Sequence, residues 1–453
     1  MFQKVLIANR GEIALRLIKV LNSMGVGTVA VYSDADAGLP FVAEANEAVR
    51  IGPPAAKDSY LSFDALLDAA KTTGAQAIHP GYGFLSENVD FAEACRQHQL
   101  VFIGPEVESM RRMKDKSQAR RLVSAAGVQV VPGSYGVVAD IGAAHQQAEK
   151  IGFPILCKAA GGGGGIGMAV ARSSDELDKV FRQCADRARS AFGREGIYLE
   201  RYFEAPRHIE VQILGDRFGH LIHGLERECS IQRRHQKVVE EAPSPLFSNP
   251  PGLEPTDSLR AALFESALIA ARSFGYSNAG TVEFLYAEGA FYFIEMNARL
   301  QVEHPITELT TGIDLIGWQL KLAAGEALTV SQDSVIRQGV AIEFRIYAED
   351  SVNFFPSPGT LTRYREPTGP GIRVDAGYQE GAVVTPFYDP LIAKLIVSGS
   401  SREQVIHRAR TAVREFRVEG IKTNLPLHQR ILDSEKFCRG ELSTRFIEEM
   451  GKA

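Results

Sequence analysis

The sequence predicts an α/β protein with several domains, and two observations carry this prediction. Strand-like and helical segments alternate from the N-terminus, where an apolar run over 4–8 precedes a helix over 9–25 and a strand over 27–33. At 453 residues, the chain is also long enough for roughly two to four domains with large cores. Such alternation implies a parallel sheet with ligand-facing loops at its carboxyl edge, and a third α/β region is expected over 335–446.

The N-terminal domain is expected to span residues 1–113 and to be Rossmann-like. Its first helix should end at Gly25. One face of this helix is apolar and consists of Ile13, Leu17, Leu21 and Met24. Two later strands, within 75–83 and 100–105, run into Gly/Pro turns. The first strand-to-helix turn lacks the G-x-G-x-x-G fingerprint of dinucleotide-binding domains.

A central domain is expected over 114–320, with a lid subdomain at about 131–203 that moves as a unit. The lid should contain a glycine-rich hairpin, a helix and a further strand. A β-hairpin turning near Gly215–Gly219 follows it. Asp257 is the expected N-cap of a helix over 258–274.

Composition and charge argue against several classes of function. The formal net charge of −5 gives no bulk reason to bind nucleic acid or an anionic membrane. No apolar run approaches the ~18 residues of a membrane span, and the N-terminus does not resemble a signal peptide. The five cysteines are scattered without a CxxC motif, which favours reduced thiols in the cytoplasm and argues against a structural zinc site.

A glycine-rich stretch, ILCKAAGGGGGIGMAV at 155–170, contains five consecutive glycines after Lys158. A loop is predicted, because each glycine in a helix or strand costs about 0.5–1 kcal/mol relative to alanine. It is not a P-loop, since no Lys-Ser or Lys-Thr follows. Gly162, Gly164 and Gly167 match G-x-G-x-x-G formally, but a strand rather than a helix is expected next. The stretch is therefore either a flexible linker or a hairpin tip whose amides cover an anion.

The segment TVEFLYAEGAFYFIEMNARLQVEHP at 281–305 carries the most chemical information. If the hairpin loop is 288–290, Glu283 and Glu295 lie directly opposite each other. Like charges in a cross-strand pair are destabilising unless a cation bridges them. The pair therefore suggests a cation site.

Beyond this pair, polar and apolar residues alternate without a break. The polar face would carry Glu295, Asn297, Arg299, Gln301 and Glu303, and the other face Met296, Ala298, Leu300 and Val302. On these residues alone, the run is either a half-buried strand with a solvated polar face or a functional surface.

Three features favour a site for ATP and a metal ion. The carboxylates come with an amide, and such oxygens are ligands of Mg²⁺. An arginine and a further glutamate follow on the same face. A separate run of donors, ECSIQRRHQKVVEEAP at 228–243, contains Gln232, His235 and Lys237. At an effective dielectric constant near 20, a cation at about 4 Å from a phosphate charge contributes about 4 kcal/mol before desolvation. The combination of acids, lysines and a glycine loop therefore indicates a site for ATP and a metal ion more strongly than any one of these features does alone.

The motifs match a known family in order along nearly the whole chain. They are ANRGEIALR, AIHPGYGFLSEN, KAAGGGGGIGM, RECSIQRRHQKVVEEAP, FIEMNARLQVEHPITE, RIYAED, YDPLIAKLI and EGIKTN. With them, the chain resembles the biotin carboxylases, the ATP-grasp components of biotin-dependent carboxylases such as acetyl-CoA carboxylase of fatty acid biosynthesis. The resemblance implies a pre-ATP-grasp N-terminal domain, an ATP-grasp domain with a lid, and a C-terminal biotin carboxylase domain.

The implied reaction is ATP-dependent carboxylation of biotin by bicarbonate through carboxyphosphate, giving carboxybiotin, ADP and phosphate. Glu303 would be the base that deprotonates bicarbonate, and Lys237 would lie where the γ-phosphate meets bicarbonate. Arg345 would face biotin and stabilise its enolate. The other implied contacts are those of Arg299, Gln301 and the Val302 backbone with bicarbonate, and those of Tyr82 and Gly83 with biotin.

The resemblance also implies nucleotide and metal contacts. The glycine loop would close over the phosphates as a lid that excludes water, because carboxyphosphate hydrolyses. Glu283, Glu295 and Asn297 would ligate Mg²⁺ or Mn²⁺, with two ions expected, and the two glutamates would reach ATP in this way. The remaining nucleotide contacts would come from Lys116, Lys158, Gly164, Gly165, Glu200, the backbone through Phe203, His208, Gln232 and His235.

Partners follow from the same resemblance. No Met-Lys-Met biotinylation sequence occurs, so biotin is expected to arrive on a biotin carboxyl carrier protein or domain. A carboxyltransferase component and a homodimer are also expected. Two positions depart from the family pattern: Ile166 stands where a basic residue usually follows the glycines, and Ala298 stands where threonine is usual.

Less specific interpretations remain open. His208 fits an ordinary hairpin position, Tyr82 fits a packing role, Arg345 could pair with Glu343 or Glu349, and Cys229 is expected to be a packed thiol. Another ATP-grasp ligase of the carbamoyl-phosphate-synthase type is an alternative, disfavoured by the RRHQK and HPGYGFLSEN segments. A non-catalytic nucleotide-sensing subunit is a further alternative, disfavoured by intact Glu303, Arg299 and Lys237.

Overall fold

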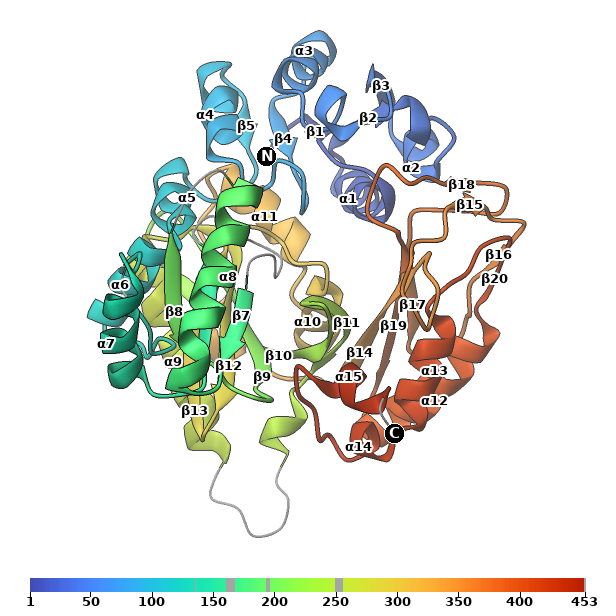
Figure 1. Ribbon diagram of the computed structural model, residues 1–453. Helices are drawn as coiled ribbons and strands as arrows, with labels where there is room; N and C mark the ends of the chain where they lie inside the picture. Colours follow the sequence, from blue (N-terminus) through green and yellow to red (C-terminus); the bar gives the residue numbers. More distant parts are fainter. Residues whose placement is uncertain (135, 160–167, 193–195, 249–255, 452–453) are drawn as a thin grey trace.

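A computed structural model of the chain describes residues 1–134, 136–159, 168–192, 196–248 and 256–451. In Figure 1, the N-terminal region (blue) lies at the top, the central region (green to yellow) on the left and the C-terminal region (red) at the lower right. No helix within these described residues is long and apolar enough to cross a membrane.

The N-terminal sheet is parallel, with strand order β3-β2-β1-β4-β5. Its strands are β1 (Lys4–Ile7), β2 (Gly27–Ser33), β3 (Glu47–Gly52), β4 (Ala77–His79) and β5 (Val101–Phe102), and its main helices are α1 (Gly11–Ser23), α3 (Phe63–Thr73) and α4 (Val89–Gln97), with the short α2 (Pro40–Glu44). Helix α1 buries the apolar face predicted from its spacing, and Gly25 follows the helix with a φ of 72°. The predicted alternation of strands and helices is therefore confirmed.

A small antiparallel sheet, ordered β7-β6-β8, carries the glycine-rich hairpin. Strands β6 (Ile155–Ala159) and β7 (Met168–Ala171) pair on either side of the glycine run, as predicted, and β8 (Ile197–Arg201) completes the sheet. Helices α7 (Ile141–Ile151) and α8 (Ser174–Phe192) pack on it around a separate hydrophobic cluster. Gly164, Gly165 and Ile166 lie outside the described residues.

The largest sheet has eight antiparallel strands in the order β13-β12-β9-β10-β11-β14-β19-β17. They are β9 (Arg207–Gly215), β10 (Leu221–Arg233), β11 (Gln236–Ala242), β12 (Asn278–Ala287), β13 (Ala290–Asn297), β14 (Val340–Tyr347), β17 (Ile372–Ala376) and β19 (Leu391–Gly399). Pairing of β11 with β14 carries the sheet from the central region into the C-terminal region. Side chains from both regions can therefore meet on one continuous surface.

The remaining helices pack on the large sheet or on one another. They are α5 (Val107–Lys114), α6 (Lys116–Ala125), α9 (Thr256–Phe274), α10 (His304–Thr311), α11 (Leu315–Ala323), α12 (Arg402–Glu415) and α13 (Leu425–Asp433), with short α14 (Glu435–Cys438) and α15 (Phe446–Met450). The short strands β15 (Gly359–Thr360) and β18 (Val383–Val384) form one pair, and β16 (Arg363–Arg365) and β20 (Arg417–Glu419) form another. Asp257 is the second residue of α9, so its predicted N-cap role is wrong; its carboxylate instead lies in the first turn, where the helix dipole favours negative charge.

The β12–β13 hairpin has the predicted pairing of Glu283 with Glu295, but its loop differs from the predicted one. Its loop has two residues, Glu288 and Gly289, so the expected three-residue loop over 288–290 is wrong. Both loop residues have positive φ, at 52° and 80°, which suits a tight hairpin turn. A bulge at Ile294 then shifts the register by one residue and places Glu283 opposite Glu295.

One buried histidine gives a pH-dependent stability prediction. His223 is 9% exposed and stacks on Phe264, with ring centres 4.0 Å apart, and burial lowers its pKa to about 4. Between about pH 6.5 and 4, the unfolded chain binds a proton at this residue and the folded chain does not, so acid removes stability. His223→Phe removes this loss, and its stability relative to wild type should be about 2 kcal/mol higher at pH 4.5 than at pH 7. Urea unfolding of both proteins at pH 7 and pH 4.5 measures this change. If the two proteins differ in free energy of unfolding by the same amount at both pH values, the prediction is contradicted.

Candidate active site

The predicted acidic pair lies on the large sheet, and each of its members contacts a lysine. Lys116 Nζ, at the start of α6, lies 2.6 Å from Glu295 Oε2, and Lys237 Nζ, on β11, lies 3.1 Å from Glu283 Oε1. The Lys116 side chain is 72% exposed, whereas Glu283 and Lys237 are nearly buried. Cations from two other elements therefore offset the cross-strand repulsion.

Lys237 is the centre of a buried group of three carboxylates. Besides Glu283, its Nζ lies 2.5 Å from Glu210 Oε2 on β9 and 2.8 Å from Glu303 Oε1 before α10. Burial lowers the pKa of an ammonium group, but these carboxylates outweigh burial and hold the pKa of Lys237 well above its usual range. The lysine therefore keeps its positive charge at neutral pH.

Glu303 lies between Lys237 and Arg345. Arg345 Nη2 lies 2.9 Å from Glu303 Oε2 and 2.6 Å from Glu240 Oε1. Burial raises the pKa of a carboxyl group, but Lys237, Arg345 and Arg227 outweigh it and hold the pKa of Glu303 well below its usual range. For Glu240, burial prevails and raises its pKa to about 7. Glu303 is therefore an ionised carboxylate held between two permanent cations.

The polar run 295–303 converges on this group, but it is not one strand. Strand β13 ends at Asn297, so the alternation expected along the whole run as a strand is wrong. Arg299 donates hydrogen bonds to Asn297 Oδ1 (2.8 Å) and Gln301 Oε1 (2.9 Å), and Gln301 Nε2 donates to Glu283 Oε1 (2.9 Å). Hydrogen bonds between side chains, rather than the pleat of a strand, therefore hold the row together.

The apolar residues of the same run face the interior. Met296 and Ala298 belong to a buried hydrophobic cluster, and Leu300 is fully buried. Ala298 is thus buried against apolar side chains, although it also lines the cavity that Glu295 and Asn297 line. Its backbone N–H donates to Glu87, whose carboxylate also pairs with Arg299 at 3.1 Å.

The residues expected around the nucleotide lie on neighbouring elements. Lys158 on β6 and Arg120 on α6 both form ion pairs with Glu200 on β8. Phe203 follows β8 and packs against Tyr292, with ring centres 4.8 Å apart. The lysine and the acid predicted from different segments therefore meet.

Two further predicted residues lie against Glu283. His208 Nε2 lies 3.1 Å from Glu283 Oε2, and Gln232 Nε2 lies 2.9 Å from His208 Nδ1. His208 therefore joins the acidic cluster and is not an isolated hairpin residue. His235 lies in the turn between β10 and β11 with a φ of 66°, and burial together with the nearby Lys158 lowers its pKa.

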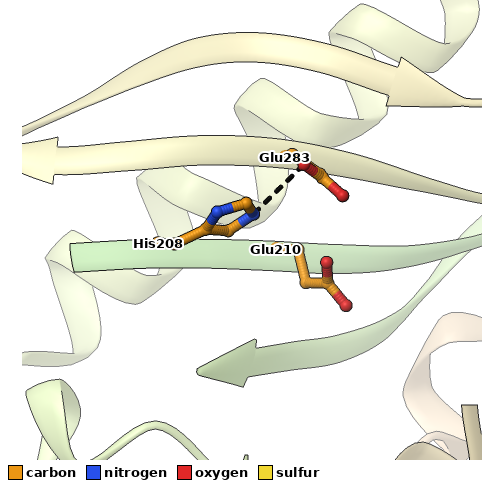
Figure 2. A group of neighbouring side chains, drawn as sticks. All are labelled: His208, Glu210 and Glu283. Atoms are coloured by element: carbon orange, nitrogen blue, oxygen red, sulfur yellow. Dashed lines mark ion pairs between the residues drawn. The ribbon is translucent and has the colours of Figure 1, made fainter. Parts of the chain in front are cut away.

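Two clusters of potential metal-ligating side chains occur in the described parts of the chain: His208 with Glu210 and Glu283, and Glu210 with Cys229 and Glu303. Figure 2 shows the first, in which His208 and Glu210 come from β9 and the imidazole points toward Glu283 on the adjacent β12. Glu283, Glu295 and Asn297 offer a neighbouring set of oxygen ligands, which suits Mg²⁺ or Mn²⁺. Since Glu283 and Glu295 already require cations, this donor set fits divalent ions.

A cavity of about 280 Å³ adjoins this set. Lys116, Glu295 and Asn297 line it on the polar side, and methionines of α5 line it on the apolar side. It therefore combines a charged and an apolar wall next to the predicted metal ligands.

The predicted biotin residues come from two distant segments of the chain. Tyr82 and Gly83 follow β4 of the N-terminal sheet, where Asn9 Nδ2 donates to the Tyr82 carbonyl at 2.7 Å and Gly83 has a φ of 69°. The Tyr82 hydroxyl is buried without a hydrogen-bond partner among the described residues. Arg345 approaches from β14, in the C-terminal part of the large sheet.

Several buried charges around these residues were not predicted from the sequence: Glu210, Arg227, Glu240 and Lys394. The Arg227 guanidinium donates hydrogen bonds to four side chains, those of Glu210, Gln212, Thr281 and Thr307. The alternation His208, Glu210, Gln212 in RHIEVQIL was an available signal, because it puts three polar residues on one face of a strand. Cys229 is fully buried, as expected for a packed thiol, and its Sγ lies 3.7 Å from Glu303 Oε1.

Three family models match the chain in order. Biotin carboxylase, N-terminal domain matches residues 1–110, Carbamoyl-phosphate synthase L chain, ATP binding domain matches 115–331, and Biotin carboxylase C-terminal domain matches 343–449. The first and last models describe biotin carboxylase domains, and the middle one covers the elements that carry the acidic pair.

Individual proteins agree over the full length. The chain is 49% identical over 450 residues to Biotin carboxylase 2 of Bacillus subtilis (strain 168), covering 99% of this chain and 100% of that protein. It matches the biotin carboxylase of Campylobacter jejuni, solved as a β,γ-ATP complex, with a TM-score of 0.93, 43% identity and 99% coverage of each chain. It also matches the biotin carboxylase domain dimer of Hydrogenobacter thermophilus 2-oxoglutarate carboxylase, solved with MgADP, ADP and bicarbonate, with a TM-score of 0.92, 45% identity, and 99% and 98% coverage. The chain therefore belongs to the biotin carboxylase family, whose ATP-grasp enzymes carboxylate biotin in the first half-reaction of biotin-dependent carboxylases.

Proposed function

We propose that Glu303, Lys237 and Arg345 carry out the chemical steps of ATP-dependent biotin carboxylation in this chain. The observation that supports this most strongly is the position of Glu303, whose two carboxylate oxygens lie 2.8 Å from Lys237 and 2.9 Å from Arg345. One base is thus in contact with a cation suited to a phosphate and with a cation suited to an enolate.

In the first step, Glu303 takes the proton of bicarbonate held by Arg299, Gln301 and the Val302 backbone. A bicarbonate oxygen forms a bond to the γ-phosphorus while the bond from that phosphorus to the β–γ bridging oxygen breaks, leaving ADP and carboxyphosphate. Lys237 neutralises the charge on the transferred phosphoryl group. Anionic substrates near Lys237 and Arg345 raise the pKa of Glu303 from its low value, which strengthens it as a base when substrates are bound.

In the second step, carboxyphosphate decomposes to CO₂ and phosphate, and the phosphate removes the ureido proton of biotin. The resulting enolate attacks CO₂ through nitrogen, and carboxybiotin forms. Arg345 stabilises the enolate with its permanent charge, and Tyr82 and Gly83 form the wall of the biotin pocket.

The nucleotide is held across the lid and the large sheet. We assign residues 1–113, 114–320 and 335–446 to three domains, with the lid at about 131–203 closing over the phosphates. Glu283, Glu295 and Asn297 would hold Mg²⁺ or Mn²⁺, which would neutralise phosphate charge. The other ATP contacts are assigned to Lys116, Lys158, Gly164, Gly165, Glu200, Phe203, His208, Gln232 and His235.

The partners follow from the reaction. Biotin is delivered by a carrier protein or domain, and a carboxyltransferase component uses the carboxybiotin. A homodimer is supported by the dimer of the Hydrogenobacter thermophilus domain, to which 99% of this chain aligns.

Phosphate release from MgATP by the full chain tests the proposal. Release should require bicarbonate and should increase with free biotin, and carboxybiotin should form in equal amount to the biotin-dependent phosphate. A carbamoyl-phosphate-synthase-type ligase would instead respond to ammonia, and a nucleotide sensor would bind ATP without turnover. Phosphate release indifferent to both bicarbonate and biotin would reject the proposed function.

A further inference from the structure

Lys394 is a fully buried cation beside the proposed site, and the mechanism above gives it no role. It lies on β19, directly opposite Arg345 on β14 and Asp375 on β17. Since opposite residues of antiparallel strands share a face, Lys394 lies on the same face of the large sheet as Arg345. The row of charges that includes the proposed enolate-stabilising arginine therefore continues to Lys394.

The Lys394 ammonium lies near residues of four separate segments of the chain. Its Nζ lies 3.1 Å from Glu12 Oε2 on α1 and 3.9 Å from Asp375 Oδ2. It donates a hydrogen bond of 3.0 Å to the Val302 carbonyl and lies 5.8 Å from the centre of the Tyr82 ring. Lys394 thus joins the turn that precedes Glu303 to the tyrosine of the biotin wall.

The hydrogen bond to Val302 acts on the backbone of the turn. The Val302 carbonyl and the N–H of Glu303 belong to one planar peptide unit, so fixing the carbonyl fixes the backbone from which the Glu303 side chain leaves. A charged donor in a buried site makes a strong hydrogen bond. The same turn carries the Val302 backbone and Gln301, which the proposed function assigns to bicarbonate.

We propose that Lys394 is a positioning residue that holds the Gln301–Val302–Glu303 turn in the geometry that binds bicarbonate. This inference rests on the proposed function. The residues that Lys394 contacts, Glu12, Asp375, Val302 and Tyr82, include none of those assigned to ATP and neither member of the acidic pair. Loss of the Lys394 ammonium should therefore raise KM for bicarbonate far more than KM for ATP.

Removing the ammonium should leave a folded protein. Burial raises the pKa of Glu12 to about 7 even with Lys394 present, so Glu12 can become neutral when the lysine is replaced. Asp375 keeps Arg373, whose guanidinium donates to it at 2.8 and 2.9 Å. Neither acid then remains as an uncompensated buried charge.

The test compares Lys394→Met, the double variant Lys394→Met/Glu12→Gln, and the exposed-lysine control Lys422→Met, all in the full chain. Steady-state phosphate release gives KM for bicarbonate and for ATP, and thermal unfolding reports stability. Lys394→Met should raise KM for bicarbonate roughly tenfold, as expected for the loss of one charged hydrogen bond, and should leave KM for ATP within about twofold. The double variant should regain thermal stability without regaining bicarbonate affinity, and Lys422→Met should match wild type.

A purely structural role for Lys394 predicts a different pattern. A double variant with the wild-type KM for bicarbonate, or an equal rise of both KM values, would overturn the inference while leaving the proposed function intact. A wild-type protein whose turnover ignores bicarbonate would reject the proposed function and this inference together. If Lys394→Met does not fold, the double variant decides the question through the same KM comparison.

Discussion

Glu303→Gln is expected to lower bicarbonate-dependent ATP turnover by about 10²–10⁴-fold, the range typical for loss of a general base. The amide has nearly the same shape as the carboxylate, but it cannot accept the proton of bicarbonate. KM for ATP should change far less than turnover, because Glu303 reaches the nucleotide only through Lys237 at the γ-phosphate and contacts none of the other residues assigned to ATP. Phosphate release with saturating MgATP and varied bicarbonate measures both quantities.

The variant should remain folded, because the two cations around position 303 keep other partners. Lys237 retains Glu210 and Glu283, and Arg345 retains Glu240. Glu265→Gln is a matched control, since Glu265 is an exposed residue of α9 with 62% of its side chain accessible. Turnover of Glu303→Gln within about threefold of this control would remove Glu303 from the role of general base.

The acidic pair could be predicted because its evidence is local. Glu283 and Glu295 lie twelve positions apart on two strands of one hairpin, and their facing follows from the two-residue period of a strand. The prediction assumed a three-residue loop, and the structure compensates for the two-residue loop with a bulge at Ile294. One extra loop residue and one bulged residue shift the strand register by the same amount. Sequence spacing alone therefore could not distinguish a three-residue loop from a two-residue loop followed by a bulge.

The partners of Arg345 could not be predicted in the same way. Glu240 and Glu303 meet it only because β11 pairs with β14 and α10 begins against the same face. Nearby acids in the sequence, Glu343 and Glu349, were the obvious alternatives, but Glu349 pairs with Arg233. Long-range strand order decides which buried charges meet, and periodicity within one segment contains no information about that order.

Arg233 and Lys237 lie within one short segment, yet only the second reaches the acidic cluster. The intervening turn places Arg234 and His235 at φ values of 50° and 66°, and so reverses the chain between β10 and β11. The residues alone named Lys237 as one of three donors in this segment, and the family resemblance then placed it where the γ-phosphate meets bicarbonate. The sequence alone assigned no role to Lys394, which is a single polar residue within an apolar strand segment.

Lys237→Met should have the largest combined effect on activity and stability. It removes the ammonium that Glu210, Glu283 and Glu303 share, at 2.5, 3.1 and 2.8 Å. Turnover should fall by about 10²–10³-fold, as for loss of a single preorganised electrostatic contact in the transition state. The free energy of unfolding at pH 8 should fall by about 3–5 kcal/mol, because breaking a buried ion pair leaves uncompensated charge. Phosphate release and urea unfolding measure these two effects, with the exposed Lys436→Met as control.

The sign of the pH and metal dependence separates this electrostatic cause from a simple packing defect. In wild type, Lys237 helps to hold the pKa values of Glu283 and Glu303 below their usual range, against the effect of burial. Without it, burial prevails and these pKa values rise, so the folded variant binds protons more readily than the unfolded chain. The variant should therefore recover stability relative to wild type as the pH falls from 8 toward 5. Mg²⁺ should also stabilise the variant more than wild type at matched ionic strength, because a divalent cation can replace the missing positive charge among the carboxylates. A stability deficit that is independent of both pH and Mg²⁺ would show that the lysine contributes packing rather than charge.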